Sequence, residues 1–276
     1  MTTPVKQKEE TPKEEKTGFT FDEKTHRYYL DGKAMTGVTT VLGVINKPAL
    51  ITWSANCAVD FIKAEIEKQT QQGLDIAGLA FGELFTDART AHTRKRDTAA
   101  EQGTDIHAIC EMLIKQAITY NKGDISLATP VLSLFDGQVL AFLKWAIKNK
   151  VIFTASEKKV YDAQTFVAGT LDFACEMDGL KYIGDIKTSS GIYGREPFAQ
   201  TAAYQYLWSA MDKKKPEEIA DRRLIINLKK TGTFDEDKDV HISEHYEDDI
   251  ELFMSALTMY RNVGRFEALH YLAKRK

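Results

Sequence analysis

Cysteine, proline and long apolar runs are all scarce in this sequence. Its 276 residues include three cysteines and six prolines. Cys57, Cys110 and Cys175 form no Cys-x-x-Cys pair, and their odd number argues against a disulfide framework, so we expect reduced thiols in a cytoplasmic protein. No apolar stretch approaches the roughly 18 residues that cross a membrane. The polar residues 1–17 contain no apolar segment typical of a secretory signal, so we expect no membrane contact.

A large excess of one charge is also missing. The 37 basic and 40 acidic side chains give a net charge of −3, which excludes a histone-like nucleic-acid binder. A local basic patch or an acidic metal site remains compatible with nucleic-acid chemistry. With 43% hydrophobic and 10% aromatic residues, the composition is that of an ordinary globular protein and excludes global disorder.

The order of the predicted elements indicates an α+β fold, a mixed β-sheet flanked by helices. Residues 1–17 are mostly Lys, Glu, Thr and Pro, and we expect them to form a disordered tail. Residues 18–276 are expected to form a single domain. Within it, we expect an N-terminal hairpin and helices over 18–90 and a larger core over 91–276.

Periodicity and turn signals place the elements along this domain. The expected elements, in chain order, are a strand hairpin within 19–32, a helix opened by Pro48, a helix over 87–120 with a break at Gly103, a helix over 131–149, three strands in 151–188, a helix from Pro197 to Met211, a strand over 222–230 and a last helix from Asp248. Residues 235–251 hold nine acidic side chains against one lysine, which predicts a solvated loop and an edge strand.

The segment 167–190 predicts a β-hairpin that brings two carboxylates together. Asp178-Gly179 is a strong two-residue turn signal, so the numbers of paired positions have a constant sum. Asp172 then lies opposite Asp185, and Lys187, one strand period further, projects from the same face. A β-bulge would shift this register. The alternative interpretation is a solvent-facing strand with scattered charges.

Directly opposed side chains in such a hairpin have Cβ atoms about 4.5–5.5 Å apart. Two carboxylates at that separation repel each other unless one is protonated or a divalent cation lies between them. On the other face of the hairpin, Leu171, Phe173 and Cys175 are expected to form one apolar row. The hairpin therefore predicts an acidic site in which one carboxylate is protonated or a divalent cation is bound.

Four ordered blocks of the sequence resemble the PD-(D/E)XK nuclease superfamily, in the RecB-type branch that includes phage-type exonucleases and a mitochondrial single-strand exonuclease. Gly103-Thr104-Asp105-Ile106-His107 is similar to the branch's Gly-Thr-x-x-His helix, and Gly169-Thr170-Leu171-Asp172 is similar to its Gly-x-x-Asp strand. Gly184-Asp185-Ile186-Lys187-Thr188-Ser189 is similar to its Asp-x-Lys-Thr block. Gln200 with Tyr204 is similar to its Gln-x-x-x-Tyr helix.

The resemblance implies a restriction-endonuclease-like core with a β-hairpin active site. It implies that Asp172 and Asp185 bind Mg²⁺, for which Mn²⁺ substitutes, and that His107 and the Ile186 carbonyl complete the metal site. It implies that Lys187 positions or deprotonates the attacking water.

Further residues are expected to support this site or to hold DNA. The resemblance implies such a role for Gln200, Tyr204 and Thr188. Glu111 lies one helical turn after His107 and is a candidate for a water-mediated contact to the metal. Arg94 and Arg96, in the basic run 89–96, are candidates for phosphate contacts, and the alternative is a solvated helix face.

The expected function is a Mg²⁺-dependent deoxyribonuclease, an exonuclease of recombination, repair or phage DNA metabolism in a bacterial or phage-infected cytoplasm. DNA is the expected partner, together with a single-strand annealing or recombination protein. No iron–sulfur cluster is expected, because the chain has no cysteine after Cys175. Two alternatives remain open: a catalytically inactive nucleic-acid-binding module on the same fold, and a helical interaction protein that uses its acidic segment.

Overall fold

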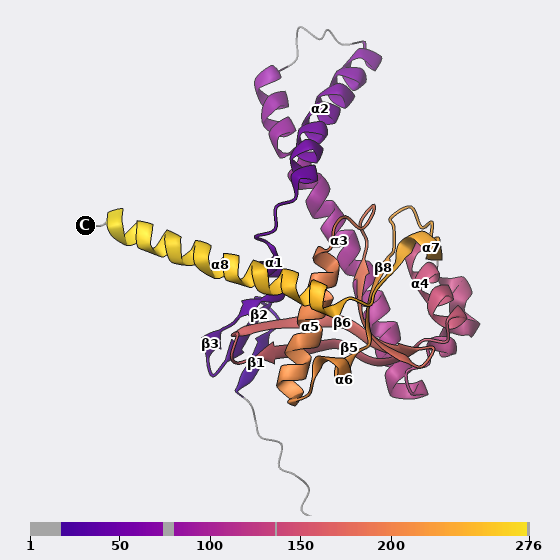
Figure 1. The fold of residues 1–276 in the computed structure, drawn as a ribbon. Helices are drawn as coiled ribbons and strands as arrows, with labels where there is room; N and C mark the ends of the chain where they lie inside the picture. Colours follow the sequence, from indigo (N-terminus) through magenta and orange to yellow (C-terminus); the bar gives the residue numbers. More distant parts are fainter. Residues whose placement is uncertain (1–17, 74–79, 136, 275–276) are drawn as a thin grey trace, which may run out of the picture.

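A six-stranded mixed β-sheet lies at the centre of the protein, with helices on both faces (Figure 1). The computed structural model describes residues 18–73, 80–135 and 137–274, without the side chains of 127, 129, 131 and 266–274. The tail expected over 1–17 lies outside the described residues. The chain therefore has the α+β class that its sequence predicts.

The long strand β6 carries the sheet. The six strands are β4 (Thr36–Gly37), β5 (Ile152–Asp162), β6 (Val167–Met177), β7 (Leu180–Lys187), β8 (Arg222–Asn227) and β9 (Val240–Ser243). One edge of β6 pairs with β5, and the other edge pairs first with β4 and then with β7. The strand β8 adds in parallel to β7, and β9 forms the far edge. The three strands expected in 151–188 and the expected edge strand are confirmed.

A smaller three-stranded sheet and the helices complete the structure. The small sheet contains β1 (Phe19–Asp22), β2 (Arg27–Leu30) and β3 (Lys33–Ala34). The helices are α1 (Val38–Leu42), α2 (Pro48–Gln71), α3 (Phe81–Asn121), η2, a 3₁₀ segment (Ile125–Leu134), α4 (Gly137–Lys148), α5 (Glu196–Asp212), α6 (Pro216–Ile219), α7 (Glu236–Asp239) and α8 (Tyr246–Lys274). Among the described residues, no helix is both long and apolar enough to span a membrane.

Two hydrophobic cores lie on opposite faces of the large sheet. One core joins α3 and α4 to the sheet through residues such as Phe142, Phe153 and Phe173. The other core joins α1, α5 and α8 to the sheet through residues such as Leu171 and Phe253. The expected row of Leu171, Phe173 and Cys175 is therefore wrong, because Leu171 packs in the second core and the other two in the first. The strand changes face between residues 171 and 173.

The helix boundaries correct two further expectations. Helix α3 runs without interruption through Gly103, where a break was expected. This buried glycine packs closely against Thr188, directly after β7. The helix expected over 131–149 begins at Gly137, since Pro130 lies in the preceding 3₁₀ segment and Phe135 is extended. Proline has no backbone N–H for an α-helical hydrogen bond, which favours such an irregular segment.

The acidic segment 235–251 is more structured than a solvated loop. Asp239 is 1% exposed and lies 2.6 Å from the ammonium of Lys229. Asp249 is fully buried and accepts a hydrogen bond of 2.6 Å from Arg195. These two carboxylates are compensated by cations that the sequence places far from them.

Asp249 also balances the fully buried Arg223. The two side chains lie 3.6 Å apart, and Ser243 donates a hydrogen bond of 2.6 Å to the same carboxylate. Arg223 comes from β8, Ser243 from β9, and Asp249 from the first turns of α8. The buried carboxylate therefore fixes the start of α8 against the edge of the sheet.

We predict that Asp249→Ala destabilises the fold by about 3–5 kcal/mol, because it leaves the guanidinium of Arg223 buried without a compensating charge. Chemical denaturation followed by circular dichroism measures the change. The exposed neighbour Asp248 provides the control, and Asp248→Ala should change the free energy of unfolding by less than about 0.5 kcal/mol. Equal effects of the two substitutions would contradict the role of the buried pair.

Candidate active site where β6 and β7 separate

The hairpin register agrees with the one that the sequence predicts as far as Phe173 opposite Gly184. Beyond that pair the backbone ladder ends. The N–H of Ile186 instead donates a hydrogen bond of 2.8 Å to the carboxylate of Asp172. Because β4 pairs with β6 only at residues 167–168, no strand among the described residues pairs with 169–172 on this edge. The two acidic residues therefore lie in a gap of the sheet.

Asp185 is the most deeply buried carboxylate of this gap, with 1% of its surface exposed. The ammonium of Lys187 lies 3.0 Å from its Oδ1 and 2.7 Å from its Oδ2. Gln200 donates a further hydrogen bond of 3.1 Å to Oδ1. Oδ2 has the ion pair but no hydrogen bond of suitable geometry, so a buried lone pair remains available.

Helix α5 supplies Gln200 and Tyr204, which are one turn apart on the same face. The amide of Gln200 accepts a hydrogen bond of 3.2 Å from Lys187 and donates one of 2.9 Å to the Tyr204 hydroxyl. The Tyr204 ring lies directly over Gly169, where an added Cβ would come within 2.5 Å of it. A glycine at 169 is therefore required for α5 to approach the acidic gap.

Helix α3 supplies His107 from the other side. Its Nδ1 lies 3.5 Å from Oδ2 of Asp172. One turn earlier, a Cβ at Gly103 would come within 2.7 Å of the Thr188 hydroxyl at the end of β7. The absence of a side chain at 103 lets the helix approach closely enough for His107 to reach the carboxylates.

The charges of the gap shift one another's ionisation. Burial, together with the negative charge of Asp185, raises the pKa of Asp172 well above its ordinary value. Burial lowers the pKa of His107, and the attraction of Asp185 only partly offsets this, so the imidazole is neutral near pH 7. Burial opposes the charge of Lys187, but the attraction of Asp185 and Asp172 exceeds it and raises the Lys187 pKa.

Glu157 of β5 also lies beside the site. Ser156 pairs with Phe173 and Lys158 with Leu171, so Glu157 stands opposite Asp172. Burial, reinforced by the charge of Glu111, raises the pKa of Glu157 to about 7. The backbone of Glu157 has a positive φ of 49° in the middle of the strand, a local irregularity that strand periodicity does not predict.

The structure brings together most of the predicted site residues, but not all of them. The gap contains Asp172, Asp185, Ile186, Lys187, His107, Thr188, Gln200 and Tyr204. Glu111 forms an ion pair with Lys115, and its charge raises the pKa of Glu157. Arg94 and Arg96 lie 13 and 11 residues before His107 in α3, about 20 and 16 Å away along the helix.

The donor atoms of the gap fit a hard divalent cation. Two carboxylates, a backbone carbonyl and a neutral imidazole are ligands that Mg²⁺ and Mn²⁺ accept. The unused lone pair of Asp185 supports this assignment. Within the described part of the chain, no three His, Cys, Asp or Glu side chains already enclose a metal-sized space. In this arrangement, the ammonium of Lys187 balances the charge of Asp185.

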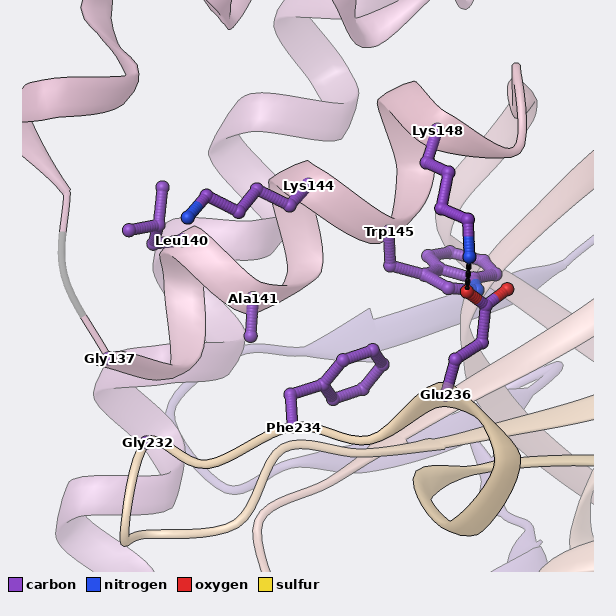
Figure 2. Close-up of a pocket in the computed structure, with 9 residues that line it drawn as sticks. All are labelled: Gly137, Leu140, Ala141, Lys144, Trp145, Lys148, Gly232, Phe234 and Glu236. Carbon is purple, nitrogen blue, oxygen red and sulfur yellow. Dashed lines mark hydrogen bonds and ion pairs between the residues drawn. The ribbon is translucent and has the colours of Figure 1, made fainter.

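A separate pocket lies between α4 and the segment 232–236 (Figure 2). Trp145 and Phe234 form part of its walls, and an ion pair of 2.5 Å joins Lys148 to Glu236 across it. None of the predicted site residues lines this pocket.

Comparisons with known proteins identify no family for this chain. No protein-family model matches it, and no curated protein matches it. The crystal structure of SSO0001 is similar at 15% sequence identity, over 54% of this chain and 71% of that chain, with a TM-score of 0.25. A similarity this distant identifies neither the fold family nor the activity.

We predict that Asp172→Asn stabilises the protein in EDTA, because the amide keeps an acceptor for the Ile186 N–H but removes the repulsion with Asp185. The Asp172 pKa is raised in the folded state, so the folded chain binds the extra proton, and wild-type stability falls as pH rises from 3.8 to the raised value. Above that interval, the variant should melt a few °C higher, about the effect of ~1 kcal/mol in a chain of this size.

Thermal unfolding of both proteins between pH 4 and pH 9 measures this difference. Glu176→Gln is the matched control, since Glu176 is an exposed carboxylate on the same strand. A variant that melts lower than wild type across the whole range would show that the carboxylate stabilises the fold without a cation.

Proposed function

We propose that the protein is a metal-dependent nuclease that hydrolyses DNA phosphodiester bonds, with a restriction-endonuclease-like core. We further propose that it is an exonuclease of recombination, repair or phage DNA metabolism. The observation that carries the proposal is the gap between β6 and β7, in which Asp172, Asp185 and Lys187 meet. A purely structural role does not explain two neighbouring carboxylates there, because their repulsion destabilises the folded chain.

The proposed cation site consists of Asp172, Asp185, His107 and the carbonyl of Ile186. A Mg²⁺ ion bound there supplies a Lewis acid that lowers the pKa of water and offsets the charge of the scissile phosphate. Asp172 is held in position by the N–H of Ile186, the residue that follows Asp185. The neutral state of His107 leaves a ring nitrogen free to act as a ligand.

Lys187 is the proposed acid–base group. Its ammonium is held by Asp185 and by the amide oxygen of Gln200. When the charge of Asp185 is compensated, the attraction that raises the Lys187 pKa weakens. The side chain can then exchange a proton with the attacking water or stabilise the charge of the transition state. Gln200 is a positioning residue, since it contacts both Lys187 and Asp185.

Digestion of end-labelled DNA, single- and double-stranded and both linear and circular, tests the proposal. We predict cleavage with Mg²⁺ or Mn²⁺ and none in EDTA. Asp185→Asn should reduce the rate at least about 10³-fold, since it removes several kcal/mol of charge stabilisation. The control is Asp178→Asn in the turn of the same hairpin, because asparagine tolerates its positive φ of 51°.

Each outcome of this experiment distinguishes one function from another. Resistance of circular DNA together with loss of label from linear ends supports an exonuclease. Binding of DNA without any digestion would favour a catalytically inactive nucleic-acid-binding module. Full activity in EDTA would contradict the metal site.

We also predict that Lys187→Ala keeps the affinity for Mn²⁺ and for DNA but lowers turnover by about 10²–10⁴, the usual effect of removing a positioned acid–base group. Lys187→Arg should not restore turnover, because a guanidinium keeps the charge but neither the shape nor the titration of lysine. Lys181→Ala on the same strand is the control for loss of a positive charge, since Lys181 pairs with Glu176 outside the gap. Near-normal turnover of Lys187→Ala would overturn the assignment.

A further inference from the structure

Helix α3 extends far beyond the candidate active site. Its 41 residues span about 60 Å at 1.5 Å per residue. The C-terminal half, which includes Gly103 and His107, packs on the sheet, whereas the N-terminal half projects from the body together with α2 (Figure 1). One continuous helix therefore runs from the acidic gap to the part of α3 that projects from the body.

The helical period places two arginines on the same face as the site residues. Arg89, Arg96 and Gly103 follow one another at intervals of seven residues, almost two full turns, and His107 follows one turn later. The rise of the helix puts Arg96 about 16 Å and Arg89 about 27 Å from His107. Both arginines are exposed.

This face of α3 differs from the face that packs against α2. The buried side chains of the N-terminal half are Leu84, Ala88 and Ala91. They lie about a third of a turn around the helix from Arg89 and Arg96, which we call the arginine row. Arg94 lies on the other side of the helix. Its guanidinium stacks 5.1 Å from the ring centre of Phe61 in α2, and it donates a hydrogen bond of 2.7 Å to Thr90.

The arginine row is free of acidic side chains. Between Arg89 and His107, the remaining positions of this face are Thr93, Ala100 and Gly103. Asp97, on the adjacent face, forms an ion pair of 2.8 Å with Arg96, but both side chains are more than 60% exposed, at 65% and 61%. Such exposed pairs contribute about 0–1 kcal/mol, so a phosphate can replace the carboxylate at little cost.

We propose that this face of α3 binds the phosphates of one DNA strand and guides that strand into the candidate active site. This inference rests on the proposed nuclease function. It assigns the strand contacts to Arg89 and Arg96, which form the proposed phosphate-binding track, with Arg94 as a structural residue between α3 and α2. A single row of cations on one helix matches one backbone, whereas a duplex presents two. Contacts of this kind position the substrate without reading its sequence.

Binding of fluorescent single-stranded DNA in EDTA, measured by anisotropy at several salt concentrations, tests the inference. The double substitution Arg89→Gln and Arg96→Gln should weaken binding and reduce the slope of log K against log salt by about 1.4, or 0.7 for each lost phosphate contact. The single substitution Arg94→Gln removes one positive charge from the opposite side of the helix and should leave this slope unchanged, whereas Arg96→Gln alone should reduce it by about 0.7. Circular dichroism confirms that each variant keeps its helices.

Cleavage kinetics separate guidance of the strand from catalysis. With Mg²⁺, the double variant should have a raised KM and a kcat within about twofold of wild type, because its arginines lie far from the reacting atoms. An unchanged salt slope in the double variant, or a loss of about 0.7 in Arg94→Gln, would overturn the proposed track. A loss confined to duplex DNA would overturn the assignment to a single strand.

Failure of the track and failure of the nuclease function give different results. If wild type cleaves DNA but the double variant has normal binding, the track is wrong and the activity stands. If the double variant shows the expected loss of salt slope but wild type never cleaves, the activity is wrong and the track stands. A wild-type protein that binds no DNA would overturn both.

Discussion

The proximity of Asp172 and Asp185 is the constraint on which the rest of the site depends. Two carboxylates beside each other in a partly buried gap repel, and burial weakens the hydration that would otherwise stabilise them. The surrounding structure compensates in several ways: Lys187 and Gln200 contact Asp185, and a backbone N–H contacts Asp172. The last of these contacts requires the strands to separate, because a closed ladder would use the N–H of Ile186.

The hairpin was predictable because its register follows from the turn. Asp178-Gly179 fixes the pairing, and the observed partners agree with it as far as Phe173 and Gly184. The separation beyond that pair could not be predicted, since it depends on a side chain replacing a backbone carbonyl as the acceptor for Ile186. The same irregularity moves Leu171 to the opposite core, because periodicity assumes a regular strand.

Long-range packing explains the other differences from the sequence-based expectations. Gly103 lowers helix propensity by up to about 1 kcal/mol, so a break was a reasonable local expectation. Its close contact with Thr188, more than 80 residues away, outweighs that preference. The acidic segment behaves in the same way: Asp249 looked solvated because its partners Arg195 and Arg223 are distant in the chain.

The unbroken course of α3 has a consequence for the whole molecule. A break at Gly103 would let the N-terminal half of the helix turn independently of His107, and the arginines would have no fixed relation to the acidic gap. The missing side chain at 103 instead allows close contact with the sheet without interrupting the helix. The orientation of Arg89 and Arg96 is therefore set by the same contact that brings His107 to Asp172, so one glycine determines both the geometry of the site and the direction from which a strand would approach it.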